Sequence, residues 1–310
     1  MDPADLADAV AVYQSAGYAA LEAQAATHGW YQVRIPFTDW DTAEHTAATS
    51  LGPYLEHAED TGVLGAWWFI RKFPCWRLRC RPSPAVTLAD VQAAITIVLD
   101  SLTAAGLIDR WWETVYEPEA CAFGGSQGME VAHGLFHADS RGILDYLRRR
   151  DPTTPPDRTI GRRELSVLLC SALFRGAGQE WHEQGDVWHR VAQMRPLAPD
   201  MPTERLRDMT AGLQRLMTVD PGPTLFSAAG LLAFAAPWVA AFEQAGRRLG
   251  GEAHDGTLQR GVRDVLAHHV IFHWNRVGLT SRTQAILART ARDIVMNPPA
   301  TLPDAHHVEG

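Results

Sequence analysis

A chain of 310 residues, of which 46% are hydrophobic and 21% charged, has the composition of a globular protein with a full hydrophobic core. The 36 acidic residues outnumber the 28 Lys and Arg residues and give a formal net charge of -8, which argues against general binding of nucleic acids. Four cysteines without a CxxC pair argue against a disulfide framework or a zinc ribbon. The amino terminus lacks the basic and apolar regions of a signal peptide, so a cytoplasmic location is expected.

The first half of the chain predicts a mixture of helices and strands. Pro3 after Asp2 favours the start of a helix, and Thr87 with Asp90 forms a capping-box pattern at the start of another. Stretches with a period of two residues predict strands between the helices. In chain order, the expected elements are a helix over 2–26 interrupted near Gly17, a strand over 30–37, a helix over 43–60, strands over 66–73 and 76–81, a helix over 87–106 and a strand over 111–117.

Three arginines alternate with apolar residues in the predicted strand 76–81. Because successive side chains of a strand point to opposite faces, Arg77, Arg79 and Arg81 are expected to share one face. Such a row of guanidinium groups suits carboxylates or peptide carbonyls as ligands, and Arg71 in the preceding strand adds to it. The alternative is a solvated face on which the arginine stems cover neighbouring tryptophans.

The stretch 111–140 has the most features of a functional site. Tyr116 lies in the predicted strand, and Glu119 follows directly after the proline that ends it. A pair of glycines comes next, which allows positive φ or a close approach of the backbone to a ligand, and a helix is predicted over 127–137. The alternative is an ordinary connection between a strand and a helix with a solvated glutamate.

The second half of the chain predicts helices only. Asp139 or Ser140 is expected to cap a helix that runs to about residue 150, and 151–157 is expected to be an exposed linker. The apolar run 225–242 predicts a buried helix kinked at Pro237 rather than a membrane span. Further helices are expected over 163–175, 180–194, 203–217, 226–249, 257–276 and 281–295.

These patterns predict an α+β protein that forms one compact catalytic unit. A mixed α/β part with an antiparallel sheet is expected over 1–150, and a mainly helical part over 158–297. The remaining residues, 298–310, are expected to be a flexible tail.

Motifs for common cofactors are absent from the sequence. The glycines near residue 125 do not form GxGxxG, and no glycine-rich loop ends in Lys followed by Ser or Thr, so no nucleotide cofactor is expected. His269 and His273 have a helical spacing that suits a metal ion, but the glutamate of HExxH is missing, and no metal is expected. Asn275 and Arg276, in the same apolar helix, either tie helices together or face a cavity with a polar ligand.

Four motifs, in order, resemble those of the thiopeptide-type bacteriocin biosynthesis proteins, a family that includes the glutamate-elimination domain of lanthipeptide dehydratases. The string AWWFIRKFPCWRLRCR at 66–81 is similar to the WFFIRY...HLRLR segment of that family. YEPEACAFGG at 116–125, the pair at 139–140 and HWNR at 273–276 are similar to its other three motifs. Residues 162–196 resemble the stand-alone members from thiopeptide clusters, the pyridine synthases.

The resemblance implies the fold of the elimination domain and the activity of a pyridine synthase. Such an enzyme joins two dehydroalanines of an azole-containing, leader-bearing precursor peptide in a formal (4+2) aza-cycloaddition. Water and the leader peptide are lost as the pyridine and its macrocycle form, and no cofactor is implied. Other biosynthetic enzymes of the cluster are further expected partners, whereas nucleic acids and membranes are not.

Two positions depart from the pattern of the elimination domains. Those domains usually carry an arginine just before the aromatic residue of their YGG motif and a histidine four residues before the Asn-Arg pair. Here the two positions hold Ala122 and Ile271. Glu119, Arg77 and Arg79 remain, so the pattern indicates that the pocket is kept while the acid/base set of an eliminase is lost, which favours cyclisation.

The resemblance and the chemistry of the residues together assign expected roles. The expected catalytic residues are Glu119, Tyr116 and His273 as proton donors and acceptors, with Asp139 and Ser140 to orient them. The expected substrate-binding residues are Arg71, Arg77, Arg79, Trp67, Trp68, Trp76, Phe123, Gly124, Gly125, Asn275 and Arg276. An acidic leader is expected to dock on clustered arginines, namely Arg148, Arg149, Arg158, Arg162 and Arg163, for which a solvated surface is the alternative.

Two other functions stay open at the level of the sequence. One is an elimination enzyme that acts on glutamylated Ser or Thr of a precursor peptide. The other is a non-catalytic protein that holds a precursor peptide for other enzymes, because many of these residues could serve recognition alone.

Overall fold

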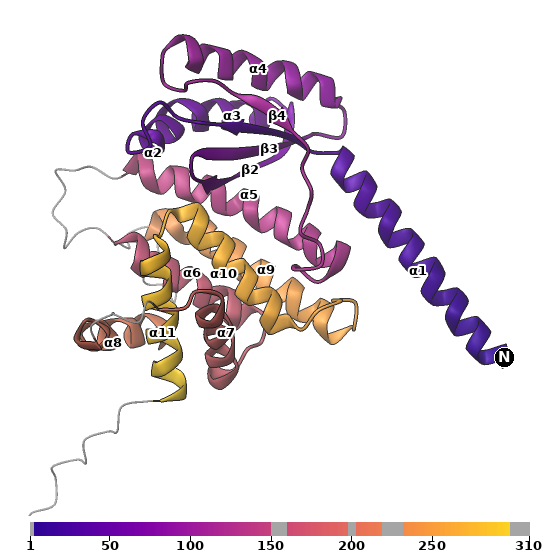
Figure 1. Cartoon of the computed structure of the whole chain (residues 1–310), viewed down its shortest axis with the longest axis vertical. Helices are drawn as coiled ribbons and strands as arrows, with labels where there is room; N and C mark the ends of the chain where they lie inside the picture. The colour runs from indigo at the N-terminus through magenta and orange to yellow at the C-terminus, as the bar shows by residue number, and fades with distance from the viewer. Residues whose placement is uncertain (1–2, 150–159, 198–202, 219–231, 298–310) are drawn as a thin grey trace, which may run out of the picture.

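The computed structural model describes residues 3–149, 160–197, 203–218 and 232–297. A four-stranded antiparallel sheet with its covering helices forms one part of the molecule, and further helices form the other (Figure 1). The predicted α+β fold is therefore confirmed. The predicted linker and tail lie outside the described residues, and the predicted domain boundaries stay a prediction.

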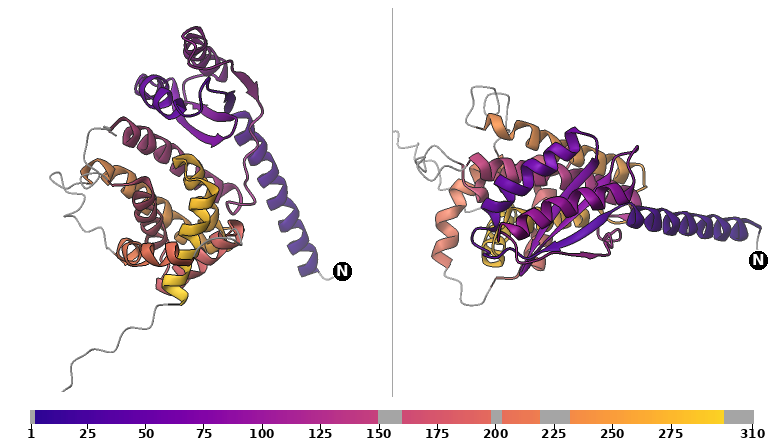
Figure 2. Two further views of the ribbon diagram at one scale, coloured as in Figure 1. Left: turned by 60° about the vertical axis from the view of Figure 1, so that its left-hand side comes forward. Right: turned by 90° about the horizontal axis from the view of Figure 1, so that it is seen from above.

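The first helix, α1 (Pro3–His28), extends away from the rest of the molecule (Figures 1 and 2). It continues without a break through Gly17, so the predicted interruption there is wrong. A glycine inside a helix costs about 1 kcal/mol relative to alanine, and the many alanines around it keep this segment helical. The side chains of Leu6, Val10 and Tyr13 are exposed along the helix.

The sheet is built from strands in the order β2-β3-β1-β4, and every neighbouring pair is antiparallel. The predicted hairpin is present, because β2 pairs with β3 along its length. The strand predicted over 111–117 is shorter than expected, and residues 115–119 leave the sheet as a loop. The strands are β1 (Tyr31–Ile35), β2 (Leu64–Lys72), β3 (Cys75–Pro82) and β4 (Trp112–Thr114).

The two faces of the sheet differ in chemistry. One face is apolar, and its core includes Trp67, Trp76 and Leu78. It packs against a helix that comprises α2 (Ala43–Thr46), a π-helical turn (Ala47–Leu51) and α3 (Gly52–Asp60), and against α4 (Leu88–Ala104). The predicted capping box of Thr87 and Asp90 is present at the start of α4.

Beneath the other face lies α5 (Gly125–Arg149), a single helix of 25 residues (Figure 1). The prediction of two helices with a cap at Asp139 or Ser140 is wrong. Ser140 Oγ accepts a hydrogen bond from the amide of Phe69 in β2 at 3.2 Å, and Asp139 binds side chains of other helices. Since both polar side chains have buried partners outside their own helix, neither interrupts its backbone.

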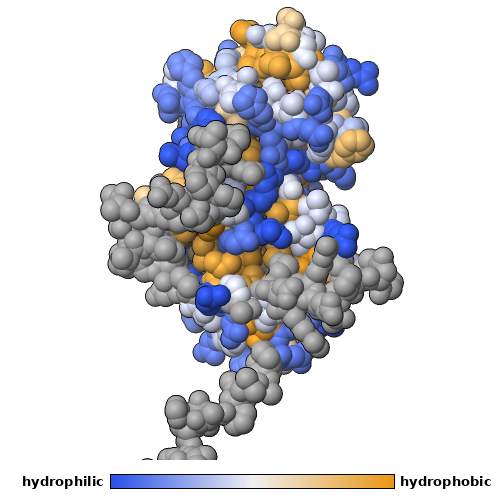
Figure 3. All heavy atoms as spheres, turned by 90° about the vertical axis from the view of Figure 1, so that its left-hand side faces the viewer, coloured by the Kyte–Doolittle hydropathy of each residue, from blue (hydrophilic) through white to orange (hydrophobic). Residues whose placement is uncertain are grey.

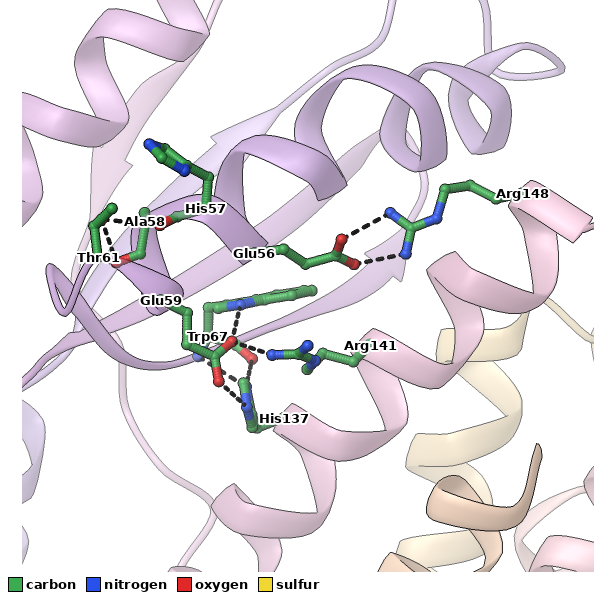
Figure 4. A network of polar contacts seen from close by, with 9 residues as sticks. All are labelled: Glu56, His57, Ala58, Glu59, Thr61, Trp67, His137, Arg141 and Arg148. Atoms are coloured by element: carbon green, nitrogen blue, oxygen red, sulfur yellow. Dashed lines mark hydrogen bonds and ion pairs between the residues drawn. The ribbon is translucent and has the colours of Figure 1, made fainter. Parts of the chain in front are cut away.

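Helix α5 also covers the free edge of β2. His137 Nδ1 lies 3.2 Å from the amide nitrogen and 2.9 Å from the carbonyl oxygen of Trp67. Figure 4 shows that the Glu59 carboxylate of α3 forms hydrogen bonds with Trp67 Nε1, His137 Nε2 and Arg141 Nη1 at 2.7–3.2 Å. These contacts fix the helix against the strand edge and satisfy polar groups that would otherwise be exposed at the edge.

The remaining helices are α6 (Arg162–Gly176), α7 (Trp181–Met194), α8 (Thr203–Thr218), α9 (Ala236–His254), α10 (Val262–Val277) and α11 (Ser281–Met296). α9 begins at Ala236 after a short 3-10 helix (Ala233–Ala235), so the helix predicted over 226–249 is wrong at 232–235, while 226–231 lie outside the described residues. Pro237 lies in its first turn, where a backbone N–H has no intrahelical partner, so the predicted kink is wrong. α10 begins after Gly261 rather than at 257, and it contacts both α5 and β2.

Several large hydrophobic residues are exposed at the surface. On the side of the molecule that Figure 3 shows, they gather over the helical part and at the top, where α4 lies. Ile97 of α4 is 67% exposed. Within the described part of the chain, every helix is too short or too polar to cross a membrane.

Candidate functional site

Four arginines line the face of the sheet that points toward α5, and we call them the arginine face: Arg34, Arg77, Arg79 and Arg81. Arg34 of β1 and Arg77 of β3 lie directly opposite each other, a pairing of like charges that costs stability. Arg34 Nε and Arg79 Nη1 are buried without a hydrogen-bond partner among the described residues. The arginine face can therefore still bind a group that accepts hydrogen bonds.

Arg79 is the most buried member of the arginine face, with 4% of its surface exposed. Its Nε donates a hydrogen bond to Gln32 Oε1 at 2.6 Å. Its guanidinium carbon lies 4.1 Å from the ring centre of Trp68 and 4.5 Å from that of Tyr116. Burial lowers the pKa of Arg79 to about 10, so the group stays charged at neutral pH. Its contacts here are an amide and two rings, which offset the cost of a buried cation only in part.

Tyr116 approaches the arginine face from the loop that follows β4. Gln32 Nε2 holds the start of this loop through Thr114 Oγ1 at 2.7 Å and Val115 O at 2.8 Å. The Tyr116 hydroxyl lies 2.8 Å from His133 Nε2 of α5. Burial and the charges of two nearby arginines lower the pKa of His133 to about 3, so this imidazole is neutral, and burial raises the pKa of Tyr116. A neutral phenol and a neutral imidazole thus share one hydrogen bond.

Glu119 is exposed on the same loop, three residues after Tyr116. Its charge raises the pKa of buried Arg79, against the larger effect of burial, and it adds to the effect of burial in raising the pKa of Tyr116. The amides of Ala122 and Phe123 donate to the Glu119 carbonyl at 2.9 and 3.2 Å and fix the turn that carries it. The site thus combines an exposed carboxylate with a buried cation and a buried phenol.

The glycine pair does not open toward this site. Gly124 and Gly125 have φ values of 85° and 95°, which other residues rarely adopt. A Cβ at Gly124 would lie 2.5 Å from a methyl carbon of Leu258, and the amide of Gln259 donates to the Gly124 carbonyl at 2.8 Å. The close approach predicted for the two glycines is therefore to the segment before α10.

Asp139 and the HWNR segment of α10 form a second buried polar cluster. Asp139 accepts hydrogen bonds from His273 Nδ1 at 2.9 Å, Arg276 Nε at 2.8 Å and Trp238 Nε1 at 3.0 Å. Burial alone would raise the pKa of Asp139, but His273 and Arg276 outweigh it and hold that pKa below its usual range. Arg276 was predicted either to tie helices together or to face a polar ligand, and its bond to Asp139 of α5 is such a tie. Asn275 Oδ1 accepts a hydrogen bond from Gln284 Nε2 of α11 at 3.0 Å.

Two polar atoms of this cluster remain available for a further hydrogen bond. Arg276 Nη1 and His273 Nε2 are buried and have no partner among the described residues. The guanidinium carbon of Arg276 lies 5.8 Å from the ring centre of Trp68, and that of Arg79 lies 4.1 Å from the same ring centre. Trp68 is therefore near both buried arginines.

Comparison with known proteins places this arrangement in a family. The sequence matches the family described as "Lantibiotic biosynthesis dehydratase C-term" over residues 30–295. The chain belongs to this family. Comparison of the sequence with curated proteins gave no match.

Solved structures share the fold of this family member at low sequence identity. The tRNA-dependent lantibiotic dehydratase MibB from Microbispora sp. 107891 is 18% identical, with a TM-score of 0.60 over 86% of this chain and 28% of MibB. The pyridine synthase TbtD from thiomuracin biosynthesis is 14% identical, with a TM-score of 0.55 over 86% of this chain and 97% of TbtD. TsrL is 13% identical, with a TM-score of 0.55 over 84% and 93% of the two chains. The chain thus spans little more than a quarter of MibB.

Several residues predicted from the family motifs lie away from the arginine face. Trp67 and Trp76 are buried on the opposite, apolar face of the sheet. Arg71 also lies on that side, where it pairs with Glu44 and its guanidinium is 5.2 Å from the Trp76 ring centre. Ser140 binds the backbone of the edge strand. The structure thus brings Arg77, Arg79, Trp68, Tyr116 and Glu119 together but leaves these residues outside.

The arginines predicted to dock a leader peptide mostly have acidic partners within the protein. Arg148 binds Glu56 of α3 through two nitrogens at 2.6 and 3.1 Å. Arg162 binds Glu44 of α2 through two nitrogens, both at 2.8 Å. Arg149 pairs with an aspartate one turn earlier at 2.8 Å. Arg163 is exposed, and Arg158 lies outside the described residues. Docking of a leader on this cluster stays a prediction.

A third histidine near the site has no polar partner at all among the described residues. His269 is 2% exposed, both of its ring nitrogens are unpaired, and its ring lies 4.9 Å from that of Phe123 and 5.9 Å from that of Phe136. Burial, Arg276 and His268 lower the pKa of His269 to about 3. Within the described residues, no three His, Cys, Asp or Glu side chains are grouped as metal ligands would be.

Sequence reasoning missed Gln32 and His133, which complete the site. Gln32 alternates with buried apolar residues of its strand and so falls on the face of the arginines. His133 follows Met129 by four positions and precedes Phe136 by three, so all three share one side of α5. A test for polar residues on these otherwise apolar faces could have found both.

Proposed function

We propose that this protein is a pyridine synthase that acts on a leader-bearing precursor peptide with azoles and two dehydroalanines. The observation that carries the proposal is Arg79, a buried cation beside Tyr116 that forms no ion pair with an acidic side chain among the described residues. The exposed carboxylate of Glu119 acts on it through charge alone. Peptide carbonyls are the groups such donors bind. Membership of the lantibiotic dehydratase family and the shared fold with TbtD support a peptide-modifying enzyme.

The reaction needs positioning more than reactive groups. One dehydroalanine amide passes to its iminol form and becomes a 2-azadiene, and the alkene of the second dehydroalanine adds across it to give a six-membered ring. Loss of water and then of the leader as a carboxamide makes the ring aromatic, so no oxidant or reductant is needed. Arg77 and Arg79 would bind the carbonyl oxygens of the peptide. Holding the two alkenes in contact would then lower the activation free energy by several kcal/mol, on the order of what intramolecular reactions gain from proximity.

Proton transfer would fall to groups near the arginine face. Glu119 is exposed and can take the amide proton as the iminol forms, then return a proton to the leaving hydroxyl. Tyr116 keeps its proton and can donate a hydrogen bond, and His133 sets the direction of its hydroxyl. His273 has Nδ1 bound to Asp139 and so would act through that network rather than as a free base.

A second candidate is the elimination of glutamate from a glutamylated precursor. The TM-score with MibB, a lantibiotic dehydratase, is 0.60, against 0.55 for TbtD, which favours it. Against it, Ala122 and Ile271 stand where elimination domains usually carry an arginine and a histidine. Retained arginines can bind a peptide without those two groups, so we rank cyclisation first.

The test is mass spectrometry of the purified protein with a leader-bearing peptide that contains azoles and two dehydroalanines, without added metal or nucleotide. Cyclisation releases an intact leader carboxamide and leaves a core peptide lighter by water and the leader. A glutamylated precursor in a parallel reaction tests elimination. Peptide that binds but stays unchanged in both reactions would contradict an enzymatic function and favour a precursor-binding protein.

A further inference from the structure

The described part of the chain contains a cavity of about 270 Å³ that belongs to neither polar cluster of the candidate site. It lies where the carboxyl end of α7 meets the last turns of α11. Its wall consists of Ala192, Gln193, Arg195, Pro196, Leu197, Arg289 and Arg292. A cavity of this size holds one or two side chains rather than a whole cofactor.

The cavity is lined by three arginines, of which two bind one carboxylate, that of Asp293. Arg289 Nε and Arg292 Nε both donate to Asp293, at 3.0 and 2.9 Å. Burial would raise the pKa of Asp293, but these hydrogen bonds hold it below its usual range. Among the described residues Arg195 has only neutral partners, with Nε on Gln284 Oε1 at 2.7 Å and Nη1 on the Met194 carbonyl at 3.0 Å. The wall therefore has an excess of positive charge.

The charge of this wall stands out because the whole chain has a formal charge of -8. An acidic ligand is repelled by the molecule as a whole and attracted by this cavity, so charge complementarity favours a carboxylate as its occupant. A guanidinium without an acidic partner, such as that of Arg195, can bind a carboxylate through two nitrogens. The apolar part of the wall, at Ala192, Pro196 and Leu197, suits an apolar side chain beside the acid.

We propose that this cavity binds an acidic residue, together with an apolar neighbour, of the precursor peptide at a point outside the reacting core. The choice of the precursor as the source rests on the proposed function. The peptide would then be held at two places: by the arginine face, where the reaction occurs, and by the cavity between α7 and α11. Two such contacts on one chain strengthen binding beyond either alone when the peptide can span them.

The first experiment measures binding without any reaction. The probe is a fluorescently labelled peptide with two adjacent glutamates flanked by leucines, and its counterpart has glutamines in their place. We expect the acidic peptide to bind at least about ten-fold more tightly, and Arg195→Gln and Arg289→Gln each to weaken it by about five- to ten-fold. The control is Arg247→Gln on α9, which removes the same charge from a side chain that is 62% exposed and outside the cavity.

Two cavity variants are used so that a loss of peptide binding can be distinguished from a loss of the folded state. Arg195 holds Gln284, so its loss also removes a contact between α7 and α11, whereas Arg289 is 47% exposed and its replacement should leave the fold intact. Equal affinity for the two peptides, or an equal loss of affinity in the Arg247→Gln control, would overturn the proposal, because either result means diffuse charge attraction or none. Neither peptide contains dehydroalanine, so failure of the cyclisation assay leaves this result intact.

The second experiment tests the precursor as the source of the acid. With the full precursor, Arg289→Gln should raise KM by about five- to ten-fold and leave kcat unchanged, since the cavity holds substrate and transition state alike. Replacing the acidic residues of the precursor outside the reacting core by their amides should have the same effect and should not add to that of the variant. A KM that stays at the wild-type value in both cases would show that the acid bound by the cavity comes from elsewhere.

Discussion

Asp139 Oδ2 accepts a hydrogen bond from Arg276 Nε at 2.8 Å, and this contact joins two of the sequence motifs across 137 positions of the chain. The carboxylate and the guanidinium are each almost fully buried. Because the same carboxylate also binds Trp238 of α9, one acid holds α5, α9 and α10 together beneath the arginine face. Arg276 in turn lies 5.8 Å from the ring centre of Trp68, which is also near Arg79.

We expect Asp139→Asn to lower the free energy of unfolding by about 3–5 kcal/mol, because it leaves the buried charge of Arg276 without its partner. Urea unfolding at pH 7 measures this. The control is Asp145→Asn on the same helix, whose partner Arg149 is exposed, and its effect should stay below about 1 kcal/mol. An Asp139→Asn protein as stable as the control would mean that the charge pair is not what holds these helices.

The sequence predicted three members of the arginine face correctly because the strand period leaves no choice of face, but it missed Arg34 and wrongly added Arg71. Arg77, Arg79 and Arg81 must alternate with Trp76, Leu78 and Cys80 once the strand exists. The same rule could not tell which face the protein covers with a hydrophobic core and which it turns to a ligand. That depends on α3 and α4, which pack on the tryptophan side and so remove Trp67 and Trp76 from the site.

Local rules gave the wrong result at Asp139 and Ser140, since such residues usually cap helices when they have no other partners. Here the partners come from α9, α10 and β2, which are distant in the sequence. Tyr116 was identified from its motif, but its partner His133 was not, because a histidine on an apolar helix face has no local pattern that separates a packing role from a hydrogen bond.

Arg79→Lys should reduce kcat/KM for the cyclisation by about ten-fold or more, because an ammonium cannot bind Gln32 and also lie flat against two rings as the guanidinium does. Steady-state kinetics with the full precursor measures the change. The matched control is Arg110→Lys, an exposed arginine near β4 that should keep wild-type kinetics. Wild-type kcat/KM in Arg79→Lys would remove Arg79 from the site.

Glu119→Gln should slow product formation by about 100-fold at saturating peptide, within the range that general acid–base groups supply. The nearby Glu117→Gln removes another exposed acid from the same loop and should keep the wild-type rate. Product is followed by mass spectrometry at several times, with peptide binding measured in parallel. Equal rates in the two variants would show that Glu119 takes no part in proton transfer.

The two neutral histidines near the site should make the fold sensitive to acid. His133 and His269 have pKa values lowered to about 3, in the first place by burial. An unfolded chain binds protons on histidine below about pH 6.5, and the folded protein does not until about pH 3, so stability is lost as the pH falls through this range. The expected slope is at most about 1.4 kcal/mol per pH unit for each histidine.

This slope is measured by urea unfolding at pH 7, 6 and 5, a range in which few unfolded carboxylates titrate. His133→Gln and His269→Leu should each make the dependence on pH less steep, and the double variant should lose most of it. His254→Gln serves as the control, because His254 is exposed at the end of α9 and should leave the slope unchanged. A double variant that keeps the wild-type slope would mean that other groups cause the acid sensitivity and that the two imidazoles accept protons within the folded protein.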